Sequence, residues 1–201
     1  AESWYEKTTL PDMLGIPVEK VNDDRLYRTL DRLLTHKDEV CKHLQKKYED
    51  LFGTKFDFLL YDVTSTYFEG QSKSNAQAKR GYSRDHRPDC LQVCIGLVVT
   101  PEGLPVGYEV FDGNRKDVTT LDEMLELMEN TYGKANRVWV LDRGIVSEEN
   151  LEELQERKAQ YLVGTPRSML KGFKYYLTEE SWENVYEEVE VKLIKDPTYK
   201  D

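Results

Sequence analysis

The sequence predicts an α/β fold built around a mixed sheet of five strands. Short apolar runs of strand length recur along the chain, at residues 57–63, 91–100, 104–111, 137–142 and 161–163. Segments with an apolar residue every three or four positions separate the last three runs, which is the spacing of an amphipathic helix. The chain has 201 residues, 39% hydrophobic and 33% charged, which is enough for one substantial core.

The composition excludes a membrane protein and a disulfide-stabilised one. No run of about 18 apolar residues is present, and the first residues lack the basic and apolar regions of a signal peptide. Cys41, Cys90 and Cys94 are odd in number and lack the paired spacing of a zinc site or a disulfide framework. The net charge of -10 is not typical of nucleic-acid binding. We therefore expect a protein of the reducing cytoplasm with no membrane partner.

The first 54 residues are predicted to form a helical region. Residues 1–20 contain two prolines and a glycine and are expected to be irregular. A first helix starts at Asn22 or Asp23 as N-cap, and a second helix ends near Gly53. The apolar residues of each helix fall on one face: Leu26, Leu30, Leu33 and Leu34 in the first, and Val40, Leu44, Tyr48 and Leu51 in the second.

The first three strands are expected to enclose a long polar loop. Residues 57–63 form an apolar run, and the strand-favouring residues up to Phe68 extend it. Residues 70–88 are polar and contain two glycines and a proline, which indicates an exposed loop. The runs at 91–100 and 104–111 are joined by a tight turn and predict a hairpin.

A helix, a strand, a helix and a last strand follow. Thr120 and Glu123 fit a capping box for the first helix, which Gly133 ends. Ser147 caps the second helix. The inward-facing residues are Leu121, Met124, Leu125 and Met128 in the first helix, and Leu151 and Leu154 in the second. After the fifth strand, residues 165–176 are expected to be irregular or helical, and the alternation of residues 185–194 predicts a half-exposed strand.

This order of elements determines the expected sheet. A strand–helix–strand crossover is normally right-handed and lays the new strand parallel beside an earlier one. The hairpin occupies one side of the first strand, so the fourth strand takes the other side. The expected strand order is 3-2-1-4-5, which is the ribonuclease H-like arrangement.

Asp62 and Asp142 lie at the ends of the predicted first and fourth strands. Neighbouring strands lie about 5 Å apart, so the two carboxylates are expected to share a divalent metal at one edge of the sheet. A helix cap, a turn or a salt bridge to Arg143 is the alternative role of each aspartate. The glutamates after residue 142 form runs typical of a solvated surface, and none is singled out as a third ligand.

The loop after the first strand carries a local positive charge. Residues 71–90 hold five basic side chains against two aspartates, with an aromatic and a histidine side chain interleaved. Such residues beside a carboxylate edge are suited to contact a phosphate backbone or to stack on a base, although a merely soluble loop is the alternative. The candidate DNA-binding residues of the loop are Lys73, Lys79, Arg80, Tyr82, Arg84, His86 and Arg87.

Four motifs together resemble the DDE transposases of bacterial insertion sequences, most closely the insertion-sequence-four type with its ribonuclease H-like catalytic domain. They are YDVTSTYFEG at 61–70, GYSRDHRPD at 81–89, Asp112-Gly113-Asn114 with Thr119, and LDRG at 141–144. The resemblance covers roughly residues 20–195. It implies DNA transposition, in which metal-dependent hydrolysis of phosphodiesters at transposon ends precedes strand transfer to target DNA.

The resemblance also implies the roles of individual residues. Asp62 and Asp142 correspond to the first two catalytic acids and ligands of a two-metal site holding Mg²⁺ or Mn²⁺. Arg143 and the basic residues of the loop are expected to contact phosphates, and the N-terminal helices to bind transposon-end DNA. The implied partners are the transposon ends, the target DNA and a second copy of the chain in a synaptic complex.

The sequence departs from this family at its C-terminus. The third acid of the family is a glutamate on a helix after a β-rich insertion, and the chain reaches Asp201 without that signature. We therefore expect a fragment that is inactive alone, divided into a helical region (1–54), a partial catalytic core (55–177) and the start of the insertion (178–201). The alternatives are a non-catalytic DNA-binding relic or regulator of an intact transposase, another two-metal nuclease, and an unrelated α/β binding module.

Overall fold

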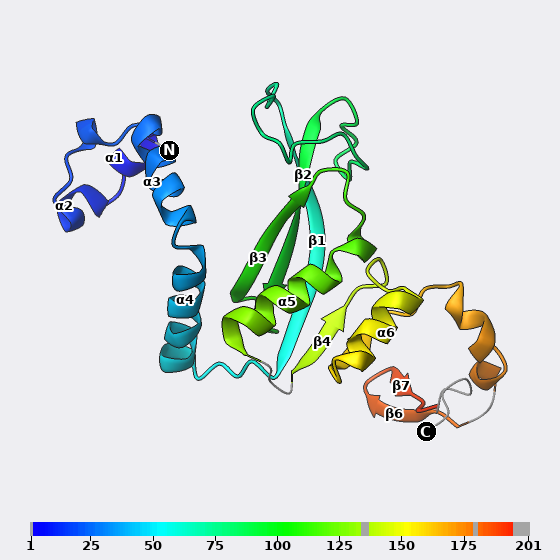
Figure 1. The fold of residues 1–201 in the computed structure, drawn as a ribbon. Helices are drawn as coiled ribbons and strands as arrows, with labels where there is room; N and C mark the ends of the chain where they lie inside the picture. The colour runs from blue at the N-terminus through cyan, green and yellow to red at the C-terminus, as the bar shows by residue number, and fades with distance from the viewer. Residues whose placement is uncertain (1, 134–136, 179–180, 195–201) are drawn as a thin grey trace.

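The computed structural model describes residues 2–133, 137–178 and 181–194. A central sheet carries helices on one side, while the N-terminal helices stand beside one edge of the sheet (Figure 1). The three cysteines are free thiols. Within the described ranges, no helix has the length and apolar character needed to cross a membrane.

Five strands form the predicted mixed sheet. They are β1 (Phe58–Phe68), β2 (Leu91–Val99), β3 (Pro105–Asp112), β4 (Val138–Leu141) and β5 (Gln160–Val163). Their order is β3-β2-β1-β4-β5, which confirms the predicted order. β1 pairs with β2 in antiparallel fashion and with β4 in parallel, and β5 is parallel to β4. β1 is much longer than β4, so the two strands run together only over the first part of β1.

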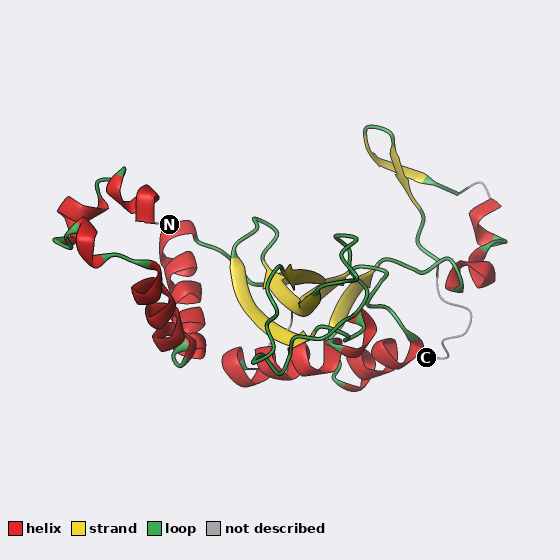
Figure 2. Ribbon diagram, turned by 90° about the horizontal axis from the view of Figure 1, so that it is seen from above, coloured by secondary structure: helices red, strands yellow, loops and turns green. Residues whose placement is uncertain are grey.

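Two helices cover one face of the sheet, α5 (Leu121–Tyr132) and α6 (Glu148–Glu156) (Figure 2). Alternate residues of β1 point into this core, and Leu59, Tyr61 and Val63 are at most 1% exposed. The predicted stripe of α5 is confirmed, since its four apolar residues are all buried. Ser147 caps α6 as predicted, because its hydroxyl accepts a hydrogen bond from the Asn150 amide at 3.1 Å.

The N-terminal region is more helical than its sequence suggests. The two predicted helices are confirmed as α3 (Asp23–Leu34), capped by Asn22, and α4 (Lys37–Phe52), which Gly53 ends in the left-handed conformation. The expectation of irregular structure before them is wrong. That stretch holds α1 (Glu2–Glu6), α2 (Leu10–Leu14) and the 3-10 turn η1 (Val18–Lys20). Pro11 does not prevent α2, because it lies in the first turn, where its missing N–H has no helical partner.

The predicted capping box before α5 is wrong. The Thr120 side chain makes no cap hydrogen bond, because it donates to the Asp117 carbonyl at 2.6 Å and accepts from the Tyr61 hydroxyl at 2.8 Å. Glu123 pairs with Arg115 instead of the N-cap amide. A 3-10 turn, η2 (Asp117–Thr119), leads into the helix, so local turn geometry replaces the side-chain cap.

The C-terminal strand prediction is also wrong. Residues 165–176 hold the 3-10 turns η3 (Met169–Phe173) and the start of η4 (Tyr176–Thr178), in line with the sequence. The alternating segment is split into a hairpin of β6 (Glu183–Tyr186) and β7 (Val189–Val191), with Glu187 at positive φ between them. Every residue of both strands is exposed. The rest of the expected insertion, residues 195–201, lies outside the described residues.

Candidate metal and DNA site

The register of the sheet places Asp62 and Asp142 side by side. The last residue pair between β1 and β4 is Tyr61 with Leu141, and both side chains are buried in the core. Side chains alternate between the faces of a strand, so the next residue of β1, Asp62, is directed away from that core. Asp142 directly follows the last residue of β4. Both aspartates are exposed. Adjacent strands are about 4.8 Å apart, so the backbone positions of the two aspartates are neighbours.

Local hydrogen bonds fix the backbone at both aspartates. Asp62 is not at the end of its strand but in the middle of β1, where β4 ends. One of its carboxylate oxygens accepts from the Val63 amide at 2.8 Å. The Asp142 carbonyl accepts from the amide of the buried Ile145 at 3.0 Å, which closes a turn. Both carboxylates therefore project from backbone that the core holds in place.

A third carboxylate, that of Asp117, lies beside Asp142. A Cβ built on Gly144 would be 3.7 Å from the Oδ2 atoms of both Asp117 and Asp142. Asp117 belongs to η2, the turn before α5. Sequence reasoning missed its proximity to Asp142, because 24 residues separate the two. Within the described part of the chain, no group of three Asp, Glu, His or Cys side chains has the arrangement of a metal site. The candidate metal site therefore rests on two acids.

Arg84 joins the basic loop to this edge. Its Nη2 donates to the Asp117 carboxylate at 2.6 Å, and its Nη1 donates to the backbone carbonyl of Val63. The two side chains are 40% and 32% exposed. Arg84 and Asp117 line a cavity of about 370 Å³ that also includes Thr64, Tyr82 and Gly144. The cavity is bounded by the loop on one side and by the strand of Asp62 on the other.

Arg87 is also engaged within the loop. Its guanidinium forms an ion pair with Asp89 at 2.9 Å and lies over the Tyr67 ring, 5.1 Å from the centroid. The hydrogen bond from Arg87 lowers the pKa of Asp89 to about 2. The other candidate residues of the loop are exposed, and their side chains form no hydrogen bond or ion pair with the residues that the structure describes; they are Lys73, Lys79, Arg80, Tyr82 and His86.

The base of the loop is held by a buried glutamine that sequence reasoning missed. Gln92 is 2% exposed, and its Nε2 donates to the carbonyls of Tyr82 at 2.9 Å and Gly113 at 2.7 Å. Gly81 and Gly113 come so close that a Cβ on Gly81 would collide with the Gly113 carbonyl. The glycines of two motifs are therefore required by packing at the loop base. The sequence did carry a signal for this role, because Gln92 is a polar residue inside the apolar run of β2.

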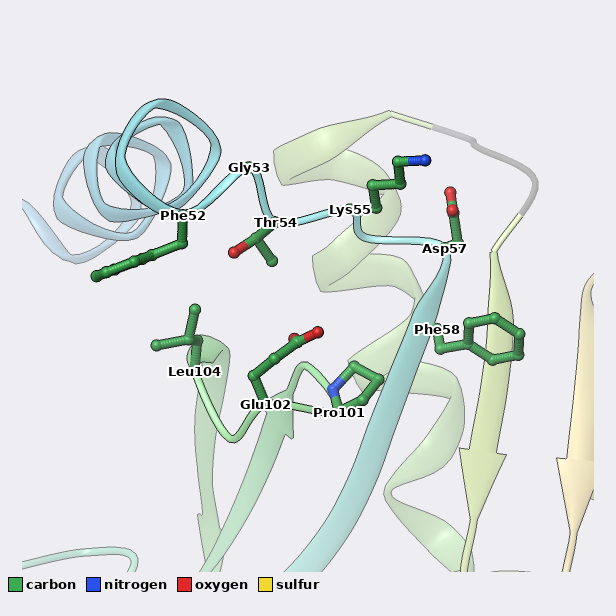
Figure 3. A pocket seen from close by; sticks show the side chains of 9 residues that line it. All are labelled: Phe52, Gly53, Thr54, Lys55, Asp57, Phe58, Pro101, Glu102 and Leu104. Carbon is green, nitrogen blue, oxygen red and sulfur yellow. The ribbon is translucent and has the colours of Figure 1, made fainter. Parts of the chain in front are cut away.

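A second cavity, of about 510 Å³, lies at the opposite end of β1 and is not part of this site (Figure 3). The linker between α4 and β1 and the turn between β2 and β3 enclose it, with Phe52, Phe58 and Leu104 among its lining. Neither Asp62 nor Asp142 lines it. Its apolar lining has no connection to the two carboxylates.

The chain matches one family of known domains over most of its length. The chain belongs to the transposase DDE domain family, which it matches over residues 53–197. This membership confirms the family-level resemblance, and DNA transposition is the function of the family. The mixed sheet has the strand order β3-β2-β1-β4-β5 that the sequence predicted. No curated protein sequence matches the chain.

Several solved transposase structures are similar in fold. One is a Mos1 transposase paired-end complex with left transposon end, at 9% identity and a TM-score of 0.37, covering 80% of this chain and 57% of that one. The Mos1 mariner paired end complex with Mn has 11% identity and a TM-score of 0.36, covering 71% and 43%. The piggyBac transposase synaptic complex with hairpin DNA has 13% identity and a TM-score of 0.40, covering 77% and 33%. The chain thus spans less than two thirds of the length of each.

Proposed function

We propose that this chain supplies two of the acids for metal-dependent phosphodiester hydrolysis and strand transfer at transposon ends. The observation that supports the proposal is the parallel register of β1 and β4, whose last pair, Tyr61 with Leu141, directly precedes two exposed aspartates, Asp62 and Asp142. The proposed class is the insertion-sequence-four type of bacterial DDE transposase. The chain alone is proposed to be catalytically inactive, because its described residues offer two acids where the family uses three.

The two carboxylates suit Mg²⁺ or Mn²⁺, which prefer oxygen ligands. When bound, such ions activate a water or hydroxyl nucleophile and stabilise the leaving oxygen of the phosphodiester. Asp62 and Asp142 would hold these ions at the open side of the sheet, where DNA has access. The turn closed by Ile145 would keep Asp142 aimed at that side.

The exposed cations beside the carboxylates are proposed to bind the DNA backbone. Lys79 and Arg80 in the loop and Arg143 after Asp142 are exposed, and none takes part in an ion pair among the described residues. Tyr82 is 85% exposed, which leaves its ring free to stack on a base. Proposed partners are transposon ends, target DNA and a second copy of the chain.

A second candidate function is a non-catalytic DNA-binding regulator of an intact transposase. The observation that favours it is the absence, among the described residues, of a complete three-acid cluster. This function predicts DNA binding that neither aspartate affects, and no cleavage under any metal condition.

The test of the metal site is a Mn²⁺ titration followed by electron paramagnetic resonance. Saturable binding is expected, with affinity weakened about tenfold or more in Asp62→Asn and in Asp142→Asn. Asp57→Asn is the matched control, because Asp57 precedes the same strand at its other end and is exposed. Affinity that is equal in all four proteins would overturn the proposed site.

A further inference from the structure

The sequence suggested that Arg84 binds DNA, but its contacts indicate another role. Both terminal nitrogens of its guanidinium already bind acceptors within the protein, Asp117 and the Val63 carbonyl. A planar guanidinium presents its donors in a fixed fork, so it can link two acceptors at once in a defined geometry. Lys79 and Arg80, in the same loop, have no such partners among the described residues.

The place where Arg84 attaches is the fork between the two acid-bearing strands. β1 and β4 are paired up to Tyr61 and Leu141, after which β4 ends and β1 continues. Val63 lies two residues beyond that last pair and directly follows Asp62. Arg84 thus binds the backbone of β1 where its parallel neighbour has ended.

The second contact of Arg84 ties the loop to the other side of the site. Asp117 belongs to η2, just before α5, and its Oδ2 lies near that of Asp142 across Gly144. Arg84 therefore connects the strand of Asp62, the turn before α5 and the loop of exposed cations. It also places a positive charge on the carboxylate next to Asp142.

We propose that Arg84 is a positioning residue that holds the basic loop over the edge bearing Asp62 and Asp142, and does not itself contact DNA. The inference rests on the proposed DNA-binding function of this edge. Asp117 is the partner that fixes the position of Arg84. We call this pair of residues the latch. Loss of either should release the loop and move its free cations away from the carboxylates.

The first experiment measures release of the loop without DNA or metal. Trypsin cleaves after Lys79 and Arg80, at the base of the loop, where the backbones of Lys79 and Gln92 exchange two hydrogen bonds. Arg84→Lys and Asp117→Asn are both expected to speed cleavage at these sites by about threefold to tenfold, which corresponds to about 0.7–1.4 kcal/mol, the range for net loss of one ordinary hydrogen bond. Asp85→Asn is the matched control, since Asp85 neighbours Arg84, is exposed and has no ion pair among the described residues. Unchanged cleavage in both latch variants would overturn the proposal.

The second experiment distinguishes positioning from DNA contact by the direction in which Asp117→Asn changes the affinity for DNA. Binding of a fluorescent duplex is measured across salt concentrations. A positioning role predicts weaker binding in both Arg84→Lys and Asp117→Asn, with an unchanged salt slope. A phosphate contact predicts little loss for Arg84→Lys and tighter binding for Asp117→Asn, because that change removes a competing anion. Arg80→Ala is the positive control and should reduce the slope by about one.

The outcomes distinguish this proposal from the proposed function. Wild-type protein that binds neither Mn²⁺ nor the duplex would count against the proposed function, while faster tryptic cleavage in the latch variants would still support the latch. Wild-type binding with tighter binding in Asp117→Asn would overturn the latch alone. Circular dichroism melts of each variant establish that the core is folded, and Asp117→Asn keeps the test decisive if Arg84→Lys does not fold.

Discussion

The two faces of the central sheet differ in what covers them and in the residues they carry. On the face toward α5 and α6, Leu59 is fully buried. On the opposite face, Phe58 is 50% exposed, Leu97 is 40% exposed and Leu162 is 63% exposed. Asp62 stands on this second face, directly paired with Leu97 in the register of β1 and β2.

The difference shows that one strand serves stability and chemistry through alternate residues. The buried positions of β1 anchor the strand in the core, and the exposed position between two of them carries the acid. A slip of one residue in register would exchange the two sets, so the burial of Tyr61 and Val63 is also what directs Asp62 outward.

The comparison is tested most strongly by truncating one leucine on each face. Leu59→Ala is expected to lower the free energy of unfolding by about 2–5 kcal/mol, because it leaves a cavity among buried residues. Leu97→Ala removes a side chain that is already 40% exposed, so a much smaller loss is expected. Urea unfolding of the two variants measures both. Equal losses would mean that the second face is covered in solution.

A smaller effect is expected from the hydrogen bond that links the covered face to the turn before α5. Tyr61→Phe removes the donor to Thr120 Oγ1 and should lower the free energy of unfolding by about 1 kcal/mol. Burial raises the pKa of Tyr61 well above its ordinary value, so its phenol remains a donor at any pH used for the experiment. The control is Tyr82→Phe. Because the Tyr82 ring is 85% exposed, this variant should have the same free energy of unfolding as the wild type. A destabilised control would show that the loop contributes to the core.

The smallest effect concerns a charge pair on the exposed loop. The pKa of Asp89 is lowered from 3.8 to about 2, chiefly by the hydrogen bond from Arg87. A carboxyl group with a lowered folded-state pKa stabilises the protein above its unfolded pKa, and this contribution is lost as the pH falls from about 4 to about 2. In Arg87→Gln the midpoint of the Asp89 carboxyl titration, followed by nuclear magnetic resonance, should rise toward 3.8. An unmoved midpoint would exclude the Arg87 contact as its cause.

The strand order was predictable because it follows from the order of elements and the handedness of one crossover. The N-cap roles of Asn22 and Ser147 were predictable because each side chain bonds an amide three residues away. Thr120 broke the same rule, since the hydroxyl of Tyr61, 59 residues earlier, binds its oxygen. Contacts between distant residues leave no local pattern, and the capping box failed for that reason.

The candidate site was only partly predictable, because some of its contacts follow from strand pairing and others join distant residues. The adjacency of Asp62 and Asp142 follows from strand pairing, which periodicity reveals. The pairing of Arg84 with Asp117 does not, because it depends on how a loop of irregular backbone folds over the sheet. The composition of the loop predicted its positive charge. Only the structure distinguishes Arg84 and Arg87, which form ion pairs, from Lys79 and Arg80, which form none among the described residues.

The backbone bridge between Lys79 and Gln92 has a consequence for how the basic loop tolerates changes in length. The two residues exchange two backbone hydrogen bonds, of 3.0 Å and 2.9 Å, which divide the loop between β1 and β2 into a part before Lys79 and a part between Lys79 and Gln92. Doubling the length of an open segment costs only about 0.6 kcal/mol, so insertions at 71–74 should be accepted. An insertion at 80–83 would lengthen the segment that the bridge closes and would move Arg84 relative to Asp117. That stretch should therefore permit substitutions but not added residues.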